Sequence, residues 1–429
     1  MNKQVTALGS LKHGLRMDDM TRHGLVMAFF SILGGIFSYL YQLSMGMLLS
    51  PENYGILYSL FSLFTIVAVL TQTISITVAN FVSKAKAQGK LSGVSYLWRF
   101  FLKRTFILGL GLFLVLALLS PLISRFLGIS SNLYPIVIFT ALIVAFIYPT
   151  NLGVLQGLQR FLPLGTTQTF WNLSKLFFGA VLVYLGLGLF GALLAIPLSF
   201  LLACLIGLFF LRDIPRYGNE AVDTGRISTY MGLAFFAFLG FTALINVDVI
   251  LARHFIPELS GDYSAISVLG KIAFYAPAGI AFALFPKTSG LFALGKETRP
   301  MLGKATLLCL LIAGVVVIIY LCFPELVANF FFRGKYPLIA PYLFKYGLAM
   351  ALSSLCFLLI NYLLSLNQTK VAYPLLGVVA VELGLLFLFH ANISQFVDVM
   401  LISSFLSVAF ILPFCFITPR HPVTYSEKT

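Results

Sequence analysis

Six ionisable side chains lie inside long apolar stretches of this sequence. They are Lys175, Asp248, Lys271, Lys345, Glu382 and Asp398. A charge in the hydrocarbon of a bilayer is costly unless it is paired or hydrated, so residues of this kind usually face a water-filled path or a binding partner. The lysines have the chemistry to bind an anionic group, and the carboxylates have the chemistry to bind a proton or a cation.

Asp248 and Lys271 are expected in the outer parts of adjacent spans, at similar depth. Two interpretations stay open: an Asp248–Lys271 ion pair that locks neighbouring helices, or Lys271 as the ligand of an anionic substrate. The two can coexist if the pair breaks when the substrate arrives. Glu382 is predicted near mid-span, too deep to reach water easily, and is a candidate for binding a proton or cation.

Uncharged polar residues form a second candidate set for hydrogen bonding to a polar ligand. Its members are Gln42, Gln72, Asn151 and Asn172. The spacing of four and then three through Thr73, Thr77 and Asn80 places polar side chains along one helical stripe. Such stripes also bind helices to one another, so this structural interpretation stands beside the ligand-binding one.

The elements that position these residues are predicted to be membrane-spanning helices. The chain has 429 residues, of which 60% are apolar and only 10% charged, and its mean hydropathy is +0.99. This composition excludes a water-soluble globular protein, a disordered chain and a disulfide scaffold. A span needs about 20 apolar residues. Twelve candidates result, near 22–48, 54–82, 101–124, 135–157, 168–188, 191–211, 229–254, 263–288, 304–324, 338–366, 372–390 and 395–417.

The basic residues predict how these spans are oriented. Of 28 Lys and Arg residues, 21 fall on the side of the N-terminus, four on the opposite side and three within spans. Because cytoplasmic loops hold the excess of Lys and Arg, both termini are predicted to be cytoplasmic. The net charge of +14 is then explained by insertion topology and contact with anionic lipid, so we expect no nucleic-acid partner.

An internal repeat appears at a shift of 206 residues. Pro51, Glu52 and Gly55 match Pro257, Glu258 and Gly261, and Gly89-Lys90 matches Gly295-Lys296. The two copies are an even number of spans apart, so they cross the membrane in the same direction. We therefore expect an all-α polytopic protein with twelve helices in two parallel six-helix lobes around a central cavity. The lobes are predicted at 1–211 and 229–429, joined by a cytoplasmic linker at 212–228.

Three segments carry a resemblance to a known family. They are Leu49-Ser50-Pro51-Glu52-Asn53-Tyr54-Gly55, Asn246-Val247-Asp248-Val249-Ile250-Leu251-Ala252, and Gly261-Asp262-Tyr263 leading to Leu284-Phe285-Pro286-Lys287. The sequence resembles the polysaccharide-exporter branch of the multidrug/oligosaccharidyl-lipid/polysaccharide exporter superfamily. The resemblance implies two six-helix lobes and transport of a polyprenyl-diphosphate-linked oligosaccharide across the cytoplasmic membrane, for cell-surface polysaccharide synthesis.

On this hypothesis Lys271 is the main ligand for the diphosphate in a central cavity. Lys175, Arg253 and Lys345 are supplementary cations, although long side chains near helix ends can also extend to water. The four uncharged polar candidates are expected to contact sugars, and Asp248 and Glu382 to serve as ion-pair or coupling residues. The lobes would rock between inward-open and outward-open forms.

Departures from related families leave alternatives open. Drug exporters of the superfamily that are coupled to cations usually have an acid in the first span, where this chain has Gln42 as its most polar buried candidate. Lipid II flippases resemble a fourteen-helix version with arginines in the first two spans. A cation-coupled multidrug exporter remains the main alternative, followed by an integral-membrane polysaccharide polymerase or ligase and a non-transporting scaffold.

An enzyme is disfavoured because the external loops are short and lack a histidine or closely spaced carboxylates. We expect no catalytic residues, no cofactor and no metal, since the five cysteines show no metal-binding spacing. The expected partners are the lipid-linked oligosaccharide and membrane lipid, with a polysaccharide polymerase or glycosyltransferase complex as a further candidate. The protein is expected to be a monomer in the cytoplasmic membrane.

Overall fold

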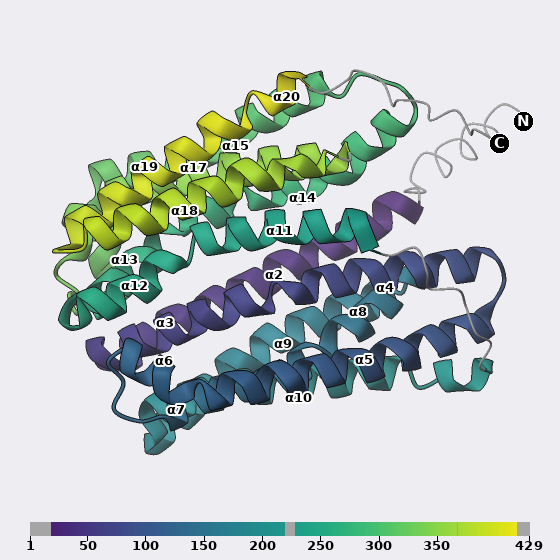
Figure 1. Cartoon of the computed structure of the whole chain (residues 1–429), viewed down its shortest axis with the longest axis horizontal. Helices are drawn as coiled ribbons and strands as arrows, with labels where there is room; N and C mark the ends of the chain where they lie inside the picture. The colour runs from purple at the N-terminus through teal and green to yellow at the C-terminus, as the bar shows by residue number, and fades with distance from the viewer. Residues whose placement is uncertain (1–18, 219–227, 367, 418–429) are drawn as a thin grey trace, which may run out of the picture.

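Helices make up all the regular structure in the described part of the chain. The computed structural model describes residues 19–218, 228–366 and 368–417. The expectation of an all-α polytopic fold is confirmed, with the helices running along the long axis of the molecule (Figure 1).

The first half of the chain supplies nine α-helices within the described residues. They are α2 (Asp19–Leu48), α3 (Pro51–Ala68), α4 (Leu70–Ala87), α5 (Leu91–Leu118), α6 (Ser120–Phe126), α7 (Leu133–Ala145), α8 (Tyr148–Gly157), α9 (Phe161–Leu182) and α10 (Gly188–Phe210). A π-helical turn, Val183–Leu187, joins α9 to α10, and a short 3-10 helix, Ile214–Tyr217, follows α10.

The second half is built in the same manner. Its helices are α11 (Ser228–Leu244), α12 (Val247–Phe255), α13 (Ser260–Gly270), α14 (Ile272–Ala293), α15 (Arg299–Cys322), α16 (Pro324–Phe332), α17 (Ile339–Ser365), α18 (Ala372–Leu388), α19 (Ile393–Ile411) and α20 (Phe414–Ile417). Short 3-10 helices, Pro257–Leu259 and Thr369–Val371, precede α13 and α18.

The number of membrane spans is lower than expected when judged by length and hydropathy alone. Nine helices of the described chain are long and apolar enough to cross a membrane, or ten if the bent pair Phe235–Leu244 and Val247–Phe255 counts as one span. One of the nine, Phe161–Phe210, contains both α9 and α10, which pack against each other. The count of twelve spans stays a prediction.

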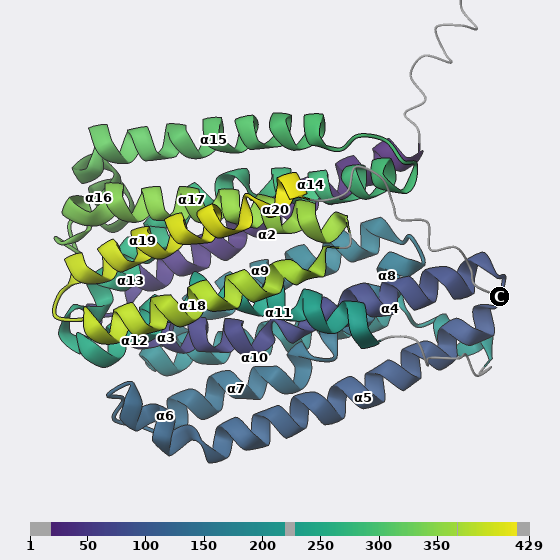
Figure 2. The same ribbon diagram turned by 45° about the horizontal axis from the view of Figure 1, so that its top comes forward.

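The two ends of the bundle are distinguished by the connections that they hold. We call the end with the α2–α3 connection, at residues 49–50, the outer end, and the opposite end, with the α4–α5 turn at residues 88–90, the inner end (Figure 1). These names agree with the orientation predicted from the basic residues. The short helices α6 and α16 both lie at the outer end (Figure 2).

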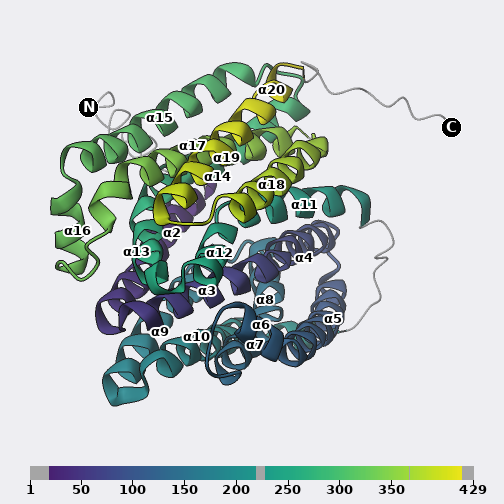
Figure 3. The same ribbon diagram turned by 60° about the vertical axis from the view of Figure 1, so that its left-hand side comes forward.

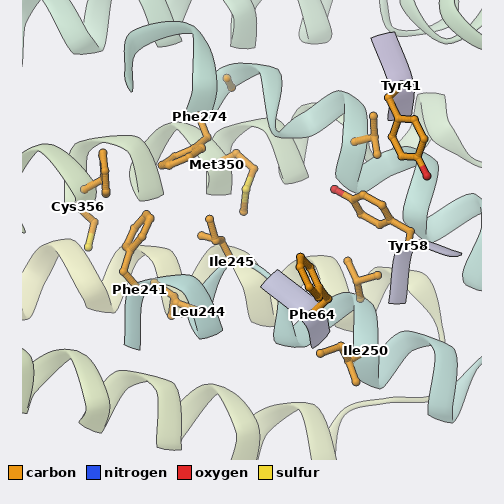
Figure 4. Packing of buried hydrophobic residues seen from close by; sticks show 14 of the residues in the cluster. Tyr41, Tyr58, Phe64, Phe241, Leu244, Ile245, Ile250, Phe274, Met350 and Cys356 are labelled. Atoms are coloured by element: carbon orange, nitrogen blue, oxygen red, sulfur yellow. The ribbon is translucent and has the colours of Figure 1, made fainter. Parts of the chain in front are cut away.

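Contacts between helices are concentrated within each half of the chain. In the first half α9 packs against α2 and α10, and in the second half α17 packs against α14, α15 and α19 (Figure 3). The halves meet mainly where α3 packs against α12 and α13. The buried core shown in Figure 4 includes Tyr58 and Phe64 of α3 together with Ile245 and Ile250 of the second half. The predicted boundaries at 211 and 229 remain a prediction, and residues 219–227 of the predicted linker lie outside the described residues.

Several spans are broken near their middle, and the breaks position polar side chains. Asn246 separates α11 from α12, and Lys271 separates α13 from α14. The Asn246 side-chain amide donates to the Thr242 carbonyl at 2.8 Å, which competes with the helical bonding of the backbone. Irregular backbone at membrane depth is tolerated only where protein or a water-filled space surrounds it. Both residues therefore belong to the interior of the bundle.

The inner-end turns after α4 and α14 have the same backbone geometry at the 206-residue shift. Gly89 and Gly295 both adopt positive φ, 71° and 67°. Lys90 N donates to Ala85 O at 3.0 Å, and Lys296 N donates to Leu291 O at 2.9 Å. These bonds cap the last carbonyls of each helix, and the left-handed conformation suits glycine because it has no Cβ.

This equivalence predicts matched effects on stability. Gly89→Ala and Gly295→Ala should each lower the free energy of unfolding by roughly 1 kcal/mol, because an L side chain is strained at positive φ. The measurement is thermal unfolding of the purified protein in detergent. Gly303→Ala is the control, since Gly303 lies inside α15 with nothing within 4 Å of an added Cβ. A loss for Gly303→Ala as large as for the other two would contradict this explanation.

Candidate functional site

Lys271 lies where the two halves of the chain meet. Its side chain is 2% exposed. The ammonium donates to Asn246 Oδ1 at 3.2 Å and to Tyr58 Oη at 3.4 Å, and it lies 5.2 Å from the centre of the Tyr58 ring. Tyr58 comes from α3 in the first half, whereas Asn246 and Lys271 come from two helix breaks in the second. We call these three residues the Lys271 site.

The Asp248–Lys271 ion pair, one of the two interpretations that the sequence leaves open, is not formed between these described residues. The ion pairs between described residues are Arg160–Asp213, Arg253–Glu52 and Lys345–Asp398. Asp248 Oδ2 instead accepts hydrogen bonds from Tyr263 at 2.8 Å and Tyr346 at 2.7 Å. The two tyrosines satisfy this oxygen within the second half, while Lys271 bonds toward α3. Asp248 and Lys271 still attract each other at longer range.

Glu382 is completely buried in α18, and neither of its carboxylate oxygens has a hydrogen-bond partner in the structure. Asp248 Oδ1 also lacks a partner, and α12, which carries Asp248, packs against α18. Glu382 and Asp248 are close enough to interact electrostatically. Because two buried negative charges without a cationic partner are very costly, this arrangement suits a protonated carboxyl group or a bound cation. We call Asp248 and Glu382 the acid pair.

Lys175 occupies a different environment, enclosed within the first half. It has no exposed surface, and its ammonium donates to Ser38 Oγ at 3.1 Å. The rings of Trp171, Tyr41 and Phe61 have their centres 5.0, 5.1 and 5.3 Å from the ammonium. Aromatic faces attract a cation most strongly when it is desolvated. These rings stabilise the buried ammonium, which forms no ion pair with a described residue.

The other predicted cations have partners of their own. Arg253 is 2% exposed and donates to Leu127 O at 2.9 Å and Gly128 O at 3.1 Å, both at the outer end of the first half. Lys345 forms a half-exposed ion pair with Asp398 at 3.0 Å. The structure therefore does not gather the expected supplementary cations around Lys271.

The predicted uncharged residues are also dispersed. Asn151 is buried in a structural contact, accepting from Trp98 Nε1 at 3.0 Å and donating to Cys204 Sγ at 3.6 Å. Asn172 donates to Gln168 O at 3.2 Å, and its Oδ1 lacks a partner. Gln42 is half-buried on α2, and Gln72 is exposed on α4.

Sequence reasoning missed the tyrosines near Lys271. Tyr39 of α2 donates to Val268 O at 3.1 Å, and Tyr320 of α15 donates to Leu269 O at 2.6 Å. Both carbonyls lie just before the break at Lys271, so these bonds hold the irregular backbone. Tyr275, in the first turn of α14, is 53% exposed. A tyrosine in an apolar span does not stand out as a candidate site residue. Contacts between tyrosines and residues of distant helices leave no local pattern in the sequence.

Comparisons with known proteins add information about the fold. Neither the protein-family models nor the curated proteins match this sequence. A solved inward-facing structure of a multidrug resistance MATE family transporter of the MOP superfamily is 14% identical, with a TM-score of 0.73, over 89% of this chain and 96% of that one. An outward-facing structure of a multidrug resistance MATE family transporter is 15% identical, with a TM-score of 0.68, over 93% and 96%.

A third similar structure is a MOP superfamily transporter from Pyrococcus furiosus, whose binding pocket is described as having reversed polarity. It is 14% identical, with a TM-score of 0.59, and the match covers 91% of this chain and 94% of that one. At these identities the likeness establishes the fold. The chain has the polytopic helical fold of the MATE transporters.

The bonding of Asp248 predicts which residues are energetically coupled. Asp248→Asn combined with Tyr346→Phe should show a coupling energy of about 1 kcal/mol or more, because the two side chains share a buried hydrogen bond. Asp248→Asn combined with Lys271→Met should show a smaller one. Thermal unfolding of the single and double variants in detergent measures both cycles. If the second coupling is the larger, Asp248 and Lys271 act as a direct pair.

Proposed function

We propose that this protein is a flippase that moves a polyprenyl-diphosphate-linked oligosaccharide across the cytoplasmic membrane by alternating access of its two halves. The observation that carries the proposal is the Lys271 site. A buried ammonium at the contact between the halves has neutral oxygens, rather than a carboxylate, as its nearest partners. No carboxylate neutralises this ammonium, so it is available to an anionic ligand, and surroundings of low dielectric strengthen the attraction between the two charges.

The partners of Lys271 also suit reversible binding. Asn246 and Tyr58 each supply a weak bond, at 3.2 and 3.4 Å, which phosphate oxygens can replace with shorter, charge-assisted bonds. Because Tyr58 belongs to the first half and Asn246 to the second, separating the halves removes one of the two partners. The site thereby couples ligand binding to the relative position of the halves.

Solved structures of the same fold in inward-facing and outward-facing forms support alternating access. Partly exposed tyrosines near Lys271, Tyr39 and Tyr275, offer ring faces and hydroxyl groups for the sugar portion. Lys175 is a second cation for the diphosphate only in a form that opens its aromatic enclosure.

The acid pair is the proposed coupling element. Tyr346 links it to the segment before Lys271: its hydroxyl donates to Asp248 Oδ2 at 2.7 Å and lies 2.9 Å from Ser267 Oγ. A phenol has one proton, so Ser267 is the donor to Tyr346 in this arrangement. A proton or cation arriving at Asp248 and Glu382 would weaken the bond that holds Tyr346. That change would reach α13 one turn before Lys271.

A cation-coupled multidrug exporter is the second candidate function. The buried, unpartnered Glu382 favours it, because an acid of this kind suits cation coupling or a cationic substrate. The multidrug transporters of the same fold also favour it. The remaining proposals are a monomer with both termini in the cytoplasm, and contact with a polysaccharide polymerase or glycosyltransferase complex.

Reconstituted transport tests the substrate. Purified protein in liposomes should move a fluorescent polyprenyl-diphosphate sugar, and Lys271→Ala should reduce the rate at least tenfold, while Lys271→Arg retains part of it because the charge survives. Lys345→Ala, which removes a half-exposed ion-paired lysine, is the matched control and should keep the rate. Movement of a cationic dye but not of the lipid-linked sugar would establish the exporter instead.

A separate measurement tests the acid pair. Glu382→Gln should abolish the response of transport to an imposed proton or sodium gradient, because the amide cannot gain or lose a proton and binds cations weakly. Exchange at equilibrium should persist. Asp398→Asn, which removes a half-exposed carboxylate, serves as the control. An unchanged gradient response in Glu382→Gln would exclude Glu382 from coupling.

A further inference from the structure

Two helices of the first half end at the outer end of the bundle, and the second half supplies the donors for their last carbonyl groups. The helices are α2 and α6, and the donors are Lys335 and Tyr336 for α2 and Arg253 and His254 for α6. We infer that these four residues form a reversible latch that closes the outer end. The inference deepens the proposed function, since it rests on alternating access.

The contact on α2 comes from the loop between α16 and α17. Tyr336 donates to Gly46 O at 2.8 Å, and Lys335 donates to Met47 O at 2.8 Å and also to Leu49 O. The last carbonyls of a helix lack partners within the helix and carry its partial negative charge, so a cation is favoured there. Partial burial lowers the pKa of the Lys335 ammonium from its ordinary value.

The contact on α6 likewise joins donors of the second half to carbonyls at the end of a first-half helix, but with different residues. Arg253 donates to Leu127 O and Gly128 O, and His254 Nδ1 lies 2.6 Å from Phe126 O. Since a carbonyl oxygen only accepts, His254 carries a proton on Nδ1 here. The His254 ring also stacks on Phe126, with ring centres 4.0 Å apart and planes 6° apart. Arg253 is further bonded to Pro257 O and Ser260 Oγ within its own half, which fixes its direction.

A close crossing of α3 and α13 accompanies these two contacts. A Cβ added at Gly55 would lie 2.3 Å from Ser260 Oγ, and one added at Gly261 would lie 2.2 Å from Pro51 O. Gly55 and Gly261 are equivalent at the 206-residue shift. The two halves therefore meet through matching glycines, and any side chain at Gly261 would press against backbone that cannot move aside.

The chemistry of the latch suits repeated opening. Its bonds join lysine, arginine, imidazole and tyrosine donors to backbone carbonyls at the membrane edge, where water can replace each partner when the halves separate. Bonds of the same kind in the hydrocarbon centre would have no such replacement. The halves of this structure are joined chiefly by α3 with α12 and α13, so the structure is the form closed at the outer end.

Distances between spin labels at the outer end test the latch without any transport assay. Labels replace Leu122 of α6 and Leu326 of α16, which are 64% and 65% exposed and come from opposite halves, in a variant free of the native cysteines. Without the latch variants, the pulsed electron–electron distance distribution should have one narrow maximum. Lys335→Ala and Arg253→Ala should each raise the ratio of long to short distances about tenfold, the effect of losing bonds from a charged donor.

The matched control is Arg125→Ala. It removes one exposed positive charge from α6 itself, at a residue to which the structure assigns no side-chain bond, and should leave the distribution unchanged. A second pair of variants leaves all four donors in place. Gly261→Ala should also lengthen the distances between the labels, whereas Gly279→Ala, with nothing within 4 Å of its added Cβ, should not.

Unchanged distances in Lys335→Ala, Arg253→Ala and Gly261→Ala would overturn the latch. If a latch variant elutes as an aggregate in size-exclusion chromatography, the conservative variant Tyr336→Phe takes its place in the test. It removes only the bond to Gly46 O and should give a smaller increase in the label-to-label distances. Because the measurement needs no substrate, a failure to transport lipid-linked sugar would leave the result on the latch intact.

Discussion

The hydrocarbon of a membrane offers no hydrogen-bond partner, so each polar group at that depth must find its partner inside the protein. The interior of this chain follows that constraint closely. Tyr39 and Tyr320 hold the carbonyls before the break at Lys271, and Asn246 bonds its own helix. The Lys175 ammonium, enclosed by aromatic rings, has Ser38 as its hydrogen-bond partner. The residues that keep helices broken and charges buried are therefore mostly aromatic and neutral.

Eleven buried side-chain atoms of the described residues have no hydrogen-bond partner, and three of them are carboxylate oxygens. Glu382 has two unpartnered oxygens, and Asp248 has one. Both belong to the second half, and Asp248 is linked through Tyr346 and Ser267 to α13, the helix that precedes Lys271. These open carboxylate oxygens are the observation from which a proton or cation is proposed to bind there. Hydrogen bonds thus connect Asp248, one member of the acid pair, to the helix that ends at Lys271.

The sequence matches at the 206-residue shift correspond to matched features in the two halves. The inner-end turns at Gly89 and Gly295 share their backbone bonds, while Gly55 and Gly261 meet at the outer end. Side chains break the symmetry: the first half holds an enclosed lysine, whereas the second holds the acid pair. Related backbones thus carry different buried charges in the two halves.

The sequence by itself determined the features that depend on composition and on positions along the chain. Its hydropathy fixed an all-helical membrane protein, and the matching of Gly89-Lys90 with Gly295-Lys296 anticipated equivalent turns. It also identified Lys271, Glu382 and Asp248 as residues that need an explanation, because a charge in an apolar run is visible without a structure. The number of spans and the lobe boundaries stay predictions.

Only the tertiary structure decided the partners of those charges. Equal depth in adjacent spans suggested an Asp248–Lys271 pair, but the rotation of each helix about its axis turns Asp248 toward Tyr263 and Tyr346 and Lys271 toward Tyr58. Arg253 was expected near a substrate and instead caps the end of α6. Depth can be counted along a sequence, whereas helix rotation is set by packing between segments that lie far apart in the chain.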